Sequence, residues 1–255
     1  MGVLSLAELK QPAVADIASA NTNINVLSKS DETDAIDIFA DAFVDDPVFA
    51  WIAGLDGNDP KRKEKMYRLC SYVFGWNRPL INGSRGVAIG IMDRENNNNM
   101  VGCMAIAPSS CHKERIIDMI RCTLKSGVPP MYTRKEKDNY CANSGKRLQA
   151  MSILTKKRVE HMQDTMRWLY LRTIGVRTEH HGNGYGKQLL QTVFKIAGSL
   201  NVPLYLETES KENEAMYQHF GFRTLEVIDM CVPGDESSDA HFDMYLMRRD
   251  PLSTD

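Results

Sequence analysis

A short segment carries three glycines at alternate positions, between a strand-like run and an amphipathic stretch. Glycine N–H groups can approach a ligand closely because no side chain intervenes. A helix that begins there adds roughly half a positive charge at its N-terminus. A phosphate or pyrophosphate is therefore the ligand that this segment fits. Its residues are His181, Gly182, Asn183, Gly184, Tyr185, Gly186 and Lys187.

Two common nucleotide motifs do not match this segment. A P-loop needs GxxxxGK followed by Ser or Thr, but the spacing from Gly182 is one residue short and Gln188 stands where the hydroxyl belongs. A dinucleotide fingerprint needs GxGxxG, whereas the glycines here are all two residues apart. The segment therefore belongs to neither of these two motifs.

The C-terminal half, which must position these residues, alternates strand and helix patterns. We expect a strand at 168–176, a helix after residue 185, a short strand at 203–207, a helix that Ser210 caps and Gly221 ends, and two strands at about 223–231 and 241–247. Strands joined through helices are parallel, and the last two are joined by a loop. This order predicts a mixed sheet with parallel strands at its centre.

The N-terminal half is less regular. Residues 1–22 alternate small and polar residues, and we expect them to form a flexible, loosely held tail. Asp46 and Pro47 have the types of an N-cap and a first helical residue. Residues 109–166 predict a mostly helical insert. Because no linker-like segment interrupts residues 23–255, they are predicted to form a single domain.

The glycine segment resembles the acyl-CoA loop of the GNAT superfamily, written Gln/Arg-x-x-Gly-x-Gly/Ala, except that His181 replaces the Arg or Gln. The following residues resemble the second half of that family's signature. They are Leu204-Tyr205-Leu206-Glu207-Thr208, Asn213, Tyr217 and Gly221-Phe222. The resemblance is close over 168–230. The Phe-x-Asp-Asp-Pro-x-x-x-Trp run within 39–51 also resembles the small-molecule branch that includes puromycin acetyltransferase-like proteins.

This resemblance implies a fold, an activity and a cosubstrate. The fold is mixed α/β: a central, mostly antiparallel sheet of about seven strands with a splayed parallel pair at its centre, flanked by helices and carrying the helical insert. The activity is transfer of an acetyl group from acetyl-CoA to a primary amine, by direct attack in a ternary complex. The acceptor is expected to be a small molecule. A protein or peptide N-acetyltransferase and a non-catalytic acyl-CoA-binding module stay open as alternatives.

The resemblance also assigns roles on the donor side. The glycine segment, 181–187, cradles the pyrophosphate, and Ile174 and Val176 supply backbone groups from the end of the preceding strand. The Val176 amide polarises the thioester carbonyl. Tyr217 is the general acid, since a phenol pKa near 10 is close to the thiol's 8.5. Asn213, one helical turn earlier on the same face, contacts the pantetheine arm.

The base and the acceptor pocket are less defined. An alkyl amine has a pKa roughly three units above neutrality, so a base is useful. Tyr170 and Arg172 occupy the strand positions from which some family members supply one, and neither is a good base. We therefore predict Glu207 as the base. The alternative is that Glu207 has no catalytic role and is a surface carboxylate or the ion-pair partner of Arg172. Asp46 and Trp51 are predicted to line the acceptor pocket, together with those two strand residues, although Asp46 also suits simple helix capping.

Composition excludes several other classes. A net charge of −2 argues against nucleic acid as a partner, and no run approaches the roughly 20 apolar residues that span a bilayer. The six cysteines show no metal-ligand spacing, so we expect no metal, and reduced thiols in the cytoplasm. A homodimer stays open.

Overall fold

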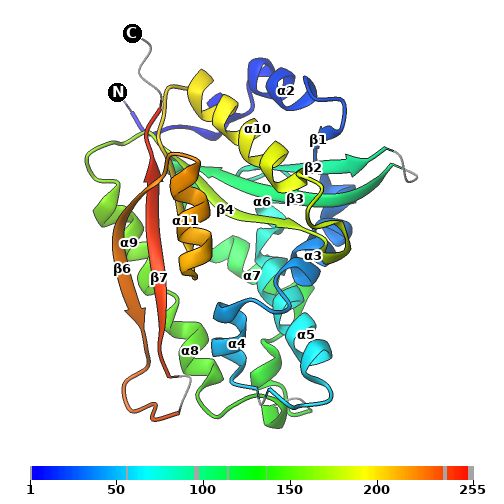
Figure 1. Ribbon diagram of the computed structural model, residues 1–255, viewed down its shortest axis with the longest axis vertical. Helices are drawn as coiled ribbons and strands as arrows, with labels where there is room; N and C mark the ends of the chain where they lie inside the picture. Colours follow the sequence, from blue (N-terminus) through cyan, green and yellow to red (C-terminus); the bar gives the residue numbers. More distant parts are fainter. Residues whose placement is uncertain are drawn as a thin grey trace.

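A seven-stranded sheet forms the centre of the computed structural model, which describes residues 2–55, 57–94, 98–113, 115–135, 137–237 and 240–251 (Figure 1). The strands are β1 (Ile24–Val26), β2 (Val87–Asp93), β3 (Asn99–Pro108), β4 (Leu169–Val176), β5 (Leu204–Thr208), β6 (Arg223–Met230) and β7 (Phe242–Arg249). Their order is β1-β2-β3-β4-β5-β7-β6, and every neighbouring pair is antiparallel except β4 and β5. The predicted mixed sheet with one central parallel pair is confirmed.

The parallel pair separates soon after it begins. The register between β4 and β5 contains only Leu169 with Leu204 and Tyr170 with Tyr205. On its other edge β4 stays paired with β3 as far as Val176. Backbone groups of β4 that face β5 beyond Tyr170 therefore have no partner strand, and the sheet is open at this point.

Helices cover both faces of the sheet, because the strands alternate their side chains between two cores. The described helices are α1 (Leu6–Leu9), α2 (Pro12–Ser19), α3 (Glu32–Ala42), α4 (Pro47–Ala53), α5 (Arg62–Phe74), α6 (Arg78–Ile81), α7 (Ile116–Ser126), α8 (Ser144–Ala150), α9 (Ile153–His161), α10 (Tyr185–Ser199) and α11 (Lys211–His219). One core joins α3, α4 and α5 to the sheet, and the other joins α1, α2, α10 and α11 to it.

The expectation of a loosely held tail at 1–22 is wrong for the described residues. A capping box between Ser5 and Glu8 begins α1, and α2 packs against α10 (Figure 1). Leu4 and Leu9 are fully buried, and Val14 is nearly so. These three side chains enter the second core, so their burial outweighs the weak helical pattern of the small residues around them.

Residues 109–166 hold α7, α8 and α9, and α8 and α9 tie this helical segment to the rest of the molecule. Arg147 of α8 is almost fully buried and forms a 2.8 Å ion pair with Asp235, in the loop that joins β6 to β7. Arg158 of α9 reaches the sheet itself. The helical segment is thus anchored by buried arginines rather than by apolar contacts alone. Within the described residues, no helix is both long and apolar enough to cross a membrane.

Candidate active site

A cavity of about 360 Å³ lies where β4 and β5 diverge, between α4 on one side and α9 on the other. Its apolar wall consists of Phe43, Val48, Phe49, Val73, Phe74, Met151, Leu154 and Met244. Its polar lining includes Asp46, Asn77, Arg158, Tyr170, Arg172, Thr173, Glu207 and Glu209. An apolar pocket with a few convergent polar groups is the usual form of a small-molecule site.

Glu207 lies in this cavity, but its carboxylate is already bound. Arg158 donates to both of its oxygens, with N···O distances of 3.0 and 3.2 Å, and the Tyr170 hydroxyl donates to one of them at 2.5 Å. Both charged side chains are less than one-tenth exposed. Both carboxylate oxygens are therefore occupied by hydrogen bonds within the protein. The arginine that pairs with Glu207 is Arg158 from α9, which the sequence did not predict.

The Arg158 guanidinium also organises the surrounding side chains. It lies 3.8 Å from the Tyr170 ring centroid and donates at 3.0 Å to the Tyr170 hydroxyl. Burial opposes its charged form, but the charge and hydrogen bonds of Glu207, together with Tyr170 and Tyr205, outweigh that effect and raise the pKa of Arg158. Arg158 is therefore a permanent cation in the floor of the cavity, neutralised by Glu207.

Two other carboxyl groups, Asp46 and Glu209, lie close together in the same cavity. Asp46 caps α4, where one oxygen accepts from the amides of Val48 at 2.8 Å and Phe49 at 3.4 Å, as its sequence pattern predicts. Burial, and then the negative charge of Glu209, raise the pKa of Asp46 well above its ordinary value. Two interacting carboxyl groups can share a proton, and such a pair is suited to accept one from a bound amine.

Glu209 connects this cavity to α11. It follows β5 directly, and its carboxylate accepts a 2.7 Å hydrogen bond from the Asn213 side chain. Its charge also acts on Tyr217, one turn further along α11. Glu209 therefore links Asn213 and Tyr217, which lie on one face of α11, to Asp46.

Tyr217 is a buried phenol on α11, 7% exposed. Its ring packs at 5.4 Å from that of Phe222, and within the described residues its hydroxyl makes no hydrogen bond. Burial, and then the charge of Glu209, raise the pKa of Tyr217. The phenol therefore stays protonated over the physiological range and has a proton to give.

The glycine segment forms an exposed loop between β4 and α10. Gly182 and Gly184 have φ of +84° and +76°, where residues with a side chain are strained, and a Cβ on either would meet nothing within 4 Å. Gly184 is the N-cap of α10, which begins at Tyr185. The loop is fastened to α3 because the Thr178 amide and hydroxyl both donate to Asp41, at 2.8 and 3.1 Å. The backbone is thus bare and positioned at a helix N-terminus, where an anion binds favourably.

His181 and Asn183 are exposed side chains of this loop, and both bond to backbone carbonyls near it. His181 lies 2.9 Å from the Val176 carbonyl, which can only accept, so Nε2 donates. Asn183 donates to the His180 carbonyl at 3.2 Å. Gly186 and Lys187 follow in the first turn of α10, and Ile174 and Val176 are half-buried at the open end of β4. His181 therefore links the loop to the strand end.

Trp51 does not line the cavity, contrary to the prediction. It is 3% exposed, packs against Phe242 with ring centroids 4.9 Å apart, and donates its indole N–H to the Ala240 carbonyl at 3.0 Å. Helix periodicity explains the difference. Asp46 lies at the start of α4 and faces the cavity, whereas Trp51, five residues later, faces β7.

Among the charged residues that line the cavity, Glu209 and Arg158 were not predicted from the sequence. Glu209 had a usable signal: it is two residues after Glu207, so the strand period places both on one side. Arg158 had none, because its position depends on how α9 packs against the sheet.

The family model and the relative that match this sequence are both described as acetyltransferases. A family model described as Acetyltransferase (GNAT) domain matches residues 140–224, from α8 through α11. An uncharacterized N-acetyltransferase of Schizosaccharomyces pombe is 37% identical over 68 residues, a match that covers 27% of this chain and only 27% of that protein.

Two solved structures share the fold. Arylalkylamine N-acetyltransferase 2 from Aedes aegypti is 12% identical with a TM-score of 0.57, over 89% of this chain and 97% of that one. A polyamine N-acetyltransferase from Drosophila melanogaster, described as catalysing the formation of N-acetylagmatine, is 13% identical with a TM-score of 0.53, over 89% and 99%. At these identities the likeness concerns the fold alone.

Proposed function

We propose that this chain is an acyltransferase of the GNAT superfamily, and that it transfers an acetyl group from acetyl-CoA to the primary amine of a small molecule. The observation that carries the proposal is the position of the cavity. It lies where β4 and β5 separate, lined by Tyr170 and Arg172 of β4 and by Glu207 of β5. Because β4 runs on from the cavity to the glycine loop, a donor bound along the end of β4 would meet an acceptor held in the cavity.

The donor is proposed to bind along the open end of β4. The backbone of 181–187 and the N-terminus of α10 would hold its pyrophosphate. The backbone of Ile174 and Val176 would hold the pantetheine arm and polarise the thioester carbonyl. Asn213 is proposed to contact the same arm, because it bonds to Glu209 at the edge of the cavity and lies one turn before Tyr217 on α11. His181 replaces the usual Arg or Gln and is bonded to the Val176 carbonyl, so the loop would rely mainly on its N–H groups.

The acceptor is proposed to be an amine with an apolar substituent. Phe43, Phe49 and Phe74 form an aromatic cluster on the cavity wall, with ring centroids 4.8–6.0 Å apart. The ammonium group would face Asp46 and Glu209. Tyr170 and Arg172 line the same cavity on the β4 side. One apolar wall and one acidic end together favour an arylalkyl or alkyl amine over a highly charged polyamine.

The reaction needs a proton to leave the amine and another to reach the departing thiolate. We propose that the Asp46–Glu209 pair takes the first, in place of Glu207, whose oxygens are occupied. Tyr217 supplies the second. The raised pKa of Tyr217 does not exclude this role, because burial raises the pKa of a thiol in the same surroundings. Glu207 is proposed to hold Arg158 and Tyr170 in position.

A peptide acceptor is less favoured. Met151 and Leu154, from the segment that contains α8 and α9, form part of the cavity wall. A segment packed over the acceptor side leaves less room for an extended chain than an open groove does. The cytoplasm is the proposed location, because all six cysteines are free thiols and reducing conditions keep them so.

Thiol release from acetyl-CoA tests the proposal. The panel contains an arylalkyl amine, a straight-chain alkyl amine, a polyamine and a peptide with a free N-terminus. Release that is fastest with the first two supports the assignment. Release with the peptide alone would make the protein a peptide acetyltransferase, and acetyl-CoA binding without release for any amine would make it a non-catalytic acyl-CoA-binding module.

A further inference from the structure

Four potential metal ligands share one face at the end of the β6–β7 hairpin. In the register between these strands, Asp229 lies opposite Asp243, and Met230 lies opposite Phe242. Residues directly opposite each other point to the same face, and so do residues two apart on one strand. Cys231 and His241, next along the hairpin, therefore lie on the face of the two aspartates. Met230 is buried on the other face.

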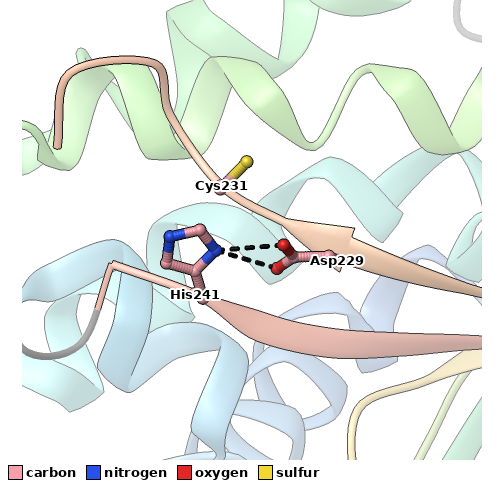
Figure 2. A group of neighbouring side chains, drawn as sticks. All are labelled: Asp229, Cys231 and His241. Atoms are coloured by element: carbon pink, nitrogen blue, oxygen red, sulfur yellow. Dashed lines mark hydrogen bonds and ion pairs between the residues drawn. The ribbon is translucent and has the colours of Figure 1, made fainter.

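Three of these side chains lie close together (Figure 2). The donor atoms of Asp229, Cys231 and His241 all lie within 4.8 Å of one another. His241 Nδ1 lies 3.0 and 3.1 Å from the two oxygens of Asp229. Ligands on a tetrahedral zinc ion are about 3.5 Å apart, given its bond lengths to sulfur and nitrogen. Small side-chain rotations would bring the donor atoms to this spacing, and all three residues are exposed and therefore able to rotate.

The electrostatics of this face favour a cation. Like charges directly opposite each other on neighbouring strands are destabilising. Within the part of the chain that the structure describes, neither Asp229 nor Asp243 pairs with a lysine or arginine, and the partner of Asp229 is His241, which is 61% exposed. A divalent ion would offset the repulsion of the two carboxylates.

We propose that the end of this hairpin binds a divalent transition metal of the zinc class, with Asp229, Cys231 and His241 as ligands and Asp243 as the fourth. Thiolate, imidazole and carboxylate are the donors that zinc takes in proteins. The expectation of no metal rested on spacing along the chain. Here the spacing is Asp-x-Cys on one strand and His-x-Asp on the next, and only the hairpin register brings the pairs together. The site is separate from the proposed acetyl transfer and does not depend on it.

Cobalt titration of the full chain tests the site, because cobalt bound to a thiolate gives a charge-transfer band in the near ultraviolet. We expect one equivalent to produce this band and zinc to abolish it. Cys231→Ser should remove the band, and His241→Ala should weaken cobalt binding by about 10-fold or more. Cys111→Ser, at a half-buried cysteine elsewhere, is the matched control and should keep the band.

Because the ligands are exposed, these variants should unfold at the wild-type temperature without metal, so loss of the band cannot be assigned to misfolding. Absence of the band in the wild type would overturn the proposal, and so would its survival in Cys231→Ser. Asp243→Asn tests the fourth ligand, and cobalt affinity unchanged by that substitution would remove Asp243 from the site.

Discussion

The proposed donor side and the proposed acceptor side of this site are built in different ways. The donor side comes from one continuous stretch, β4 through α11, and it depends on backbone conformation: Gly182, Gly184 and Gly221 all have φ between +76° and +85°. The acceptor side is assembled from α4, α9 and the end of β5, which are far apart in sequence, and it depends on side-chain pairing. Its central contacts are Arg158 with Glu207 and Asp46 with Glu209.

The two halves differ because their proposed ligands differ. A nucleotide pyrophosphate is bound by N–H groups and a helix terminus, which a short motif supplies in any member of such a family. An amine is distinguished by the shape and charge of its own pocket, which packing between distant segments supplies. Substitutions in the two halves are therefore expected to change different measured quantities.

The largest effect is expected on the acceptor side, from Arg158→Met. The substitution leaves Glu207 as a buried carboxylate without a cation, and breaking a buried pair in this way costs about 3–5 kcal/mol of unfolding free energy. Urea unfolding measures it. Arg158→Met combined with Glu207→Met should recover most of the loss, because neither charge is then left alone. A single variant as stable as the wild type would mean that this pair does not support the acceptor wall.

On the donor side, Tyr217→Phe should lower turnover by about 100-fold or more, because the proton for the thiolate is lost. Acetyl-CoA affinity should not change, since the ring still packs on Phe222. Steady-state kinetics and a binding titration separate the two quantities. Tyr245→Phe, the same change at another buried tyrosine, is the control. Equal turnover in the Tyr217 and Tyr245 variants would exclude the phenol from the mechanism.

A smaller effect is expected from Gly184→Ala. A Cβ fits sterically, but φ of +76° costs a residue with a side chain roughly 1–2 kcal/mol. If the loop must keep this conformation to bind the donor, acetyl-CoA affinity falls by about 10-fold. Gly198→Ala, near the C-terminal end of α10, should leave affinity unchanged. If both variants bound acetyl-CoA like the wild type, the backbone of Gly184 would not be part of the donor site.

The smallest effect is a displaced pH profile in Glu209→Gln. The negative charge of Glu209 contributes to raising the pKa of Asp46, so its removal lowers that pKa. Asp46 then loses its proton at lower pH, and the acid limb of kcat/KM against pH moves toward lower pH. The neutral glutamine keeps the hydrogen-bonding shape toward Asn213. An acid limb that stays in place or moves upward would show that the pair does not titrate as the base.

The same contrast explains which features could be predicted from sequence. The parallel pair, the glycine loop and the caps at Asp46 and Gly221 depend on a few neighbouring residues, and the structure has them. Arg158 could not be placed, because nothing near it in sequence indicates what α9 packs against. The expectation of a loose N-terminal tail failed for the same reason, since α1 packs on β3 and α2 packs on α10. Long-range packing decides such positions.

Thermal unfolding with and without acetyl-CoA, with NAD and ATP as controls, tests the central claim most directly, namely that the loop between β4 and α10 binds an acyl-CoA. A ligand at 100 times its Kd stabilises a protein by about 2.7 kcal/mol. For a chain of this size that corresponds to a rise in Tm of roughly 5–10 °C. The account predicts this rise with acetyl-CoA alone. A rise with NAD or ATP, and none with acetyl-CoA, would contradict it.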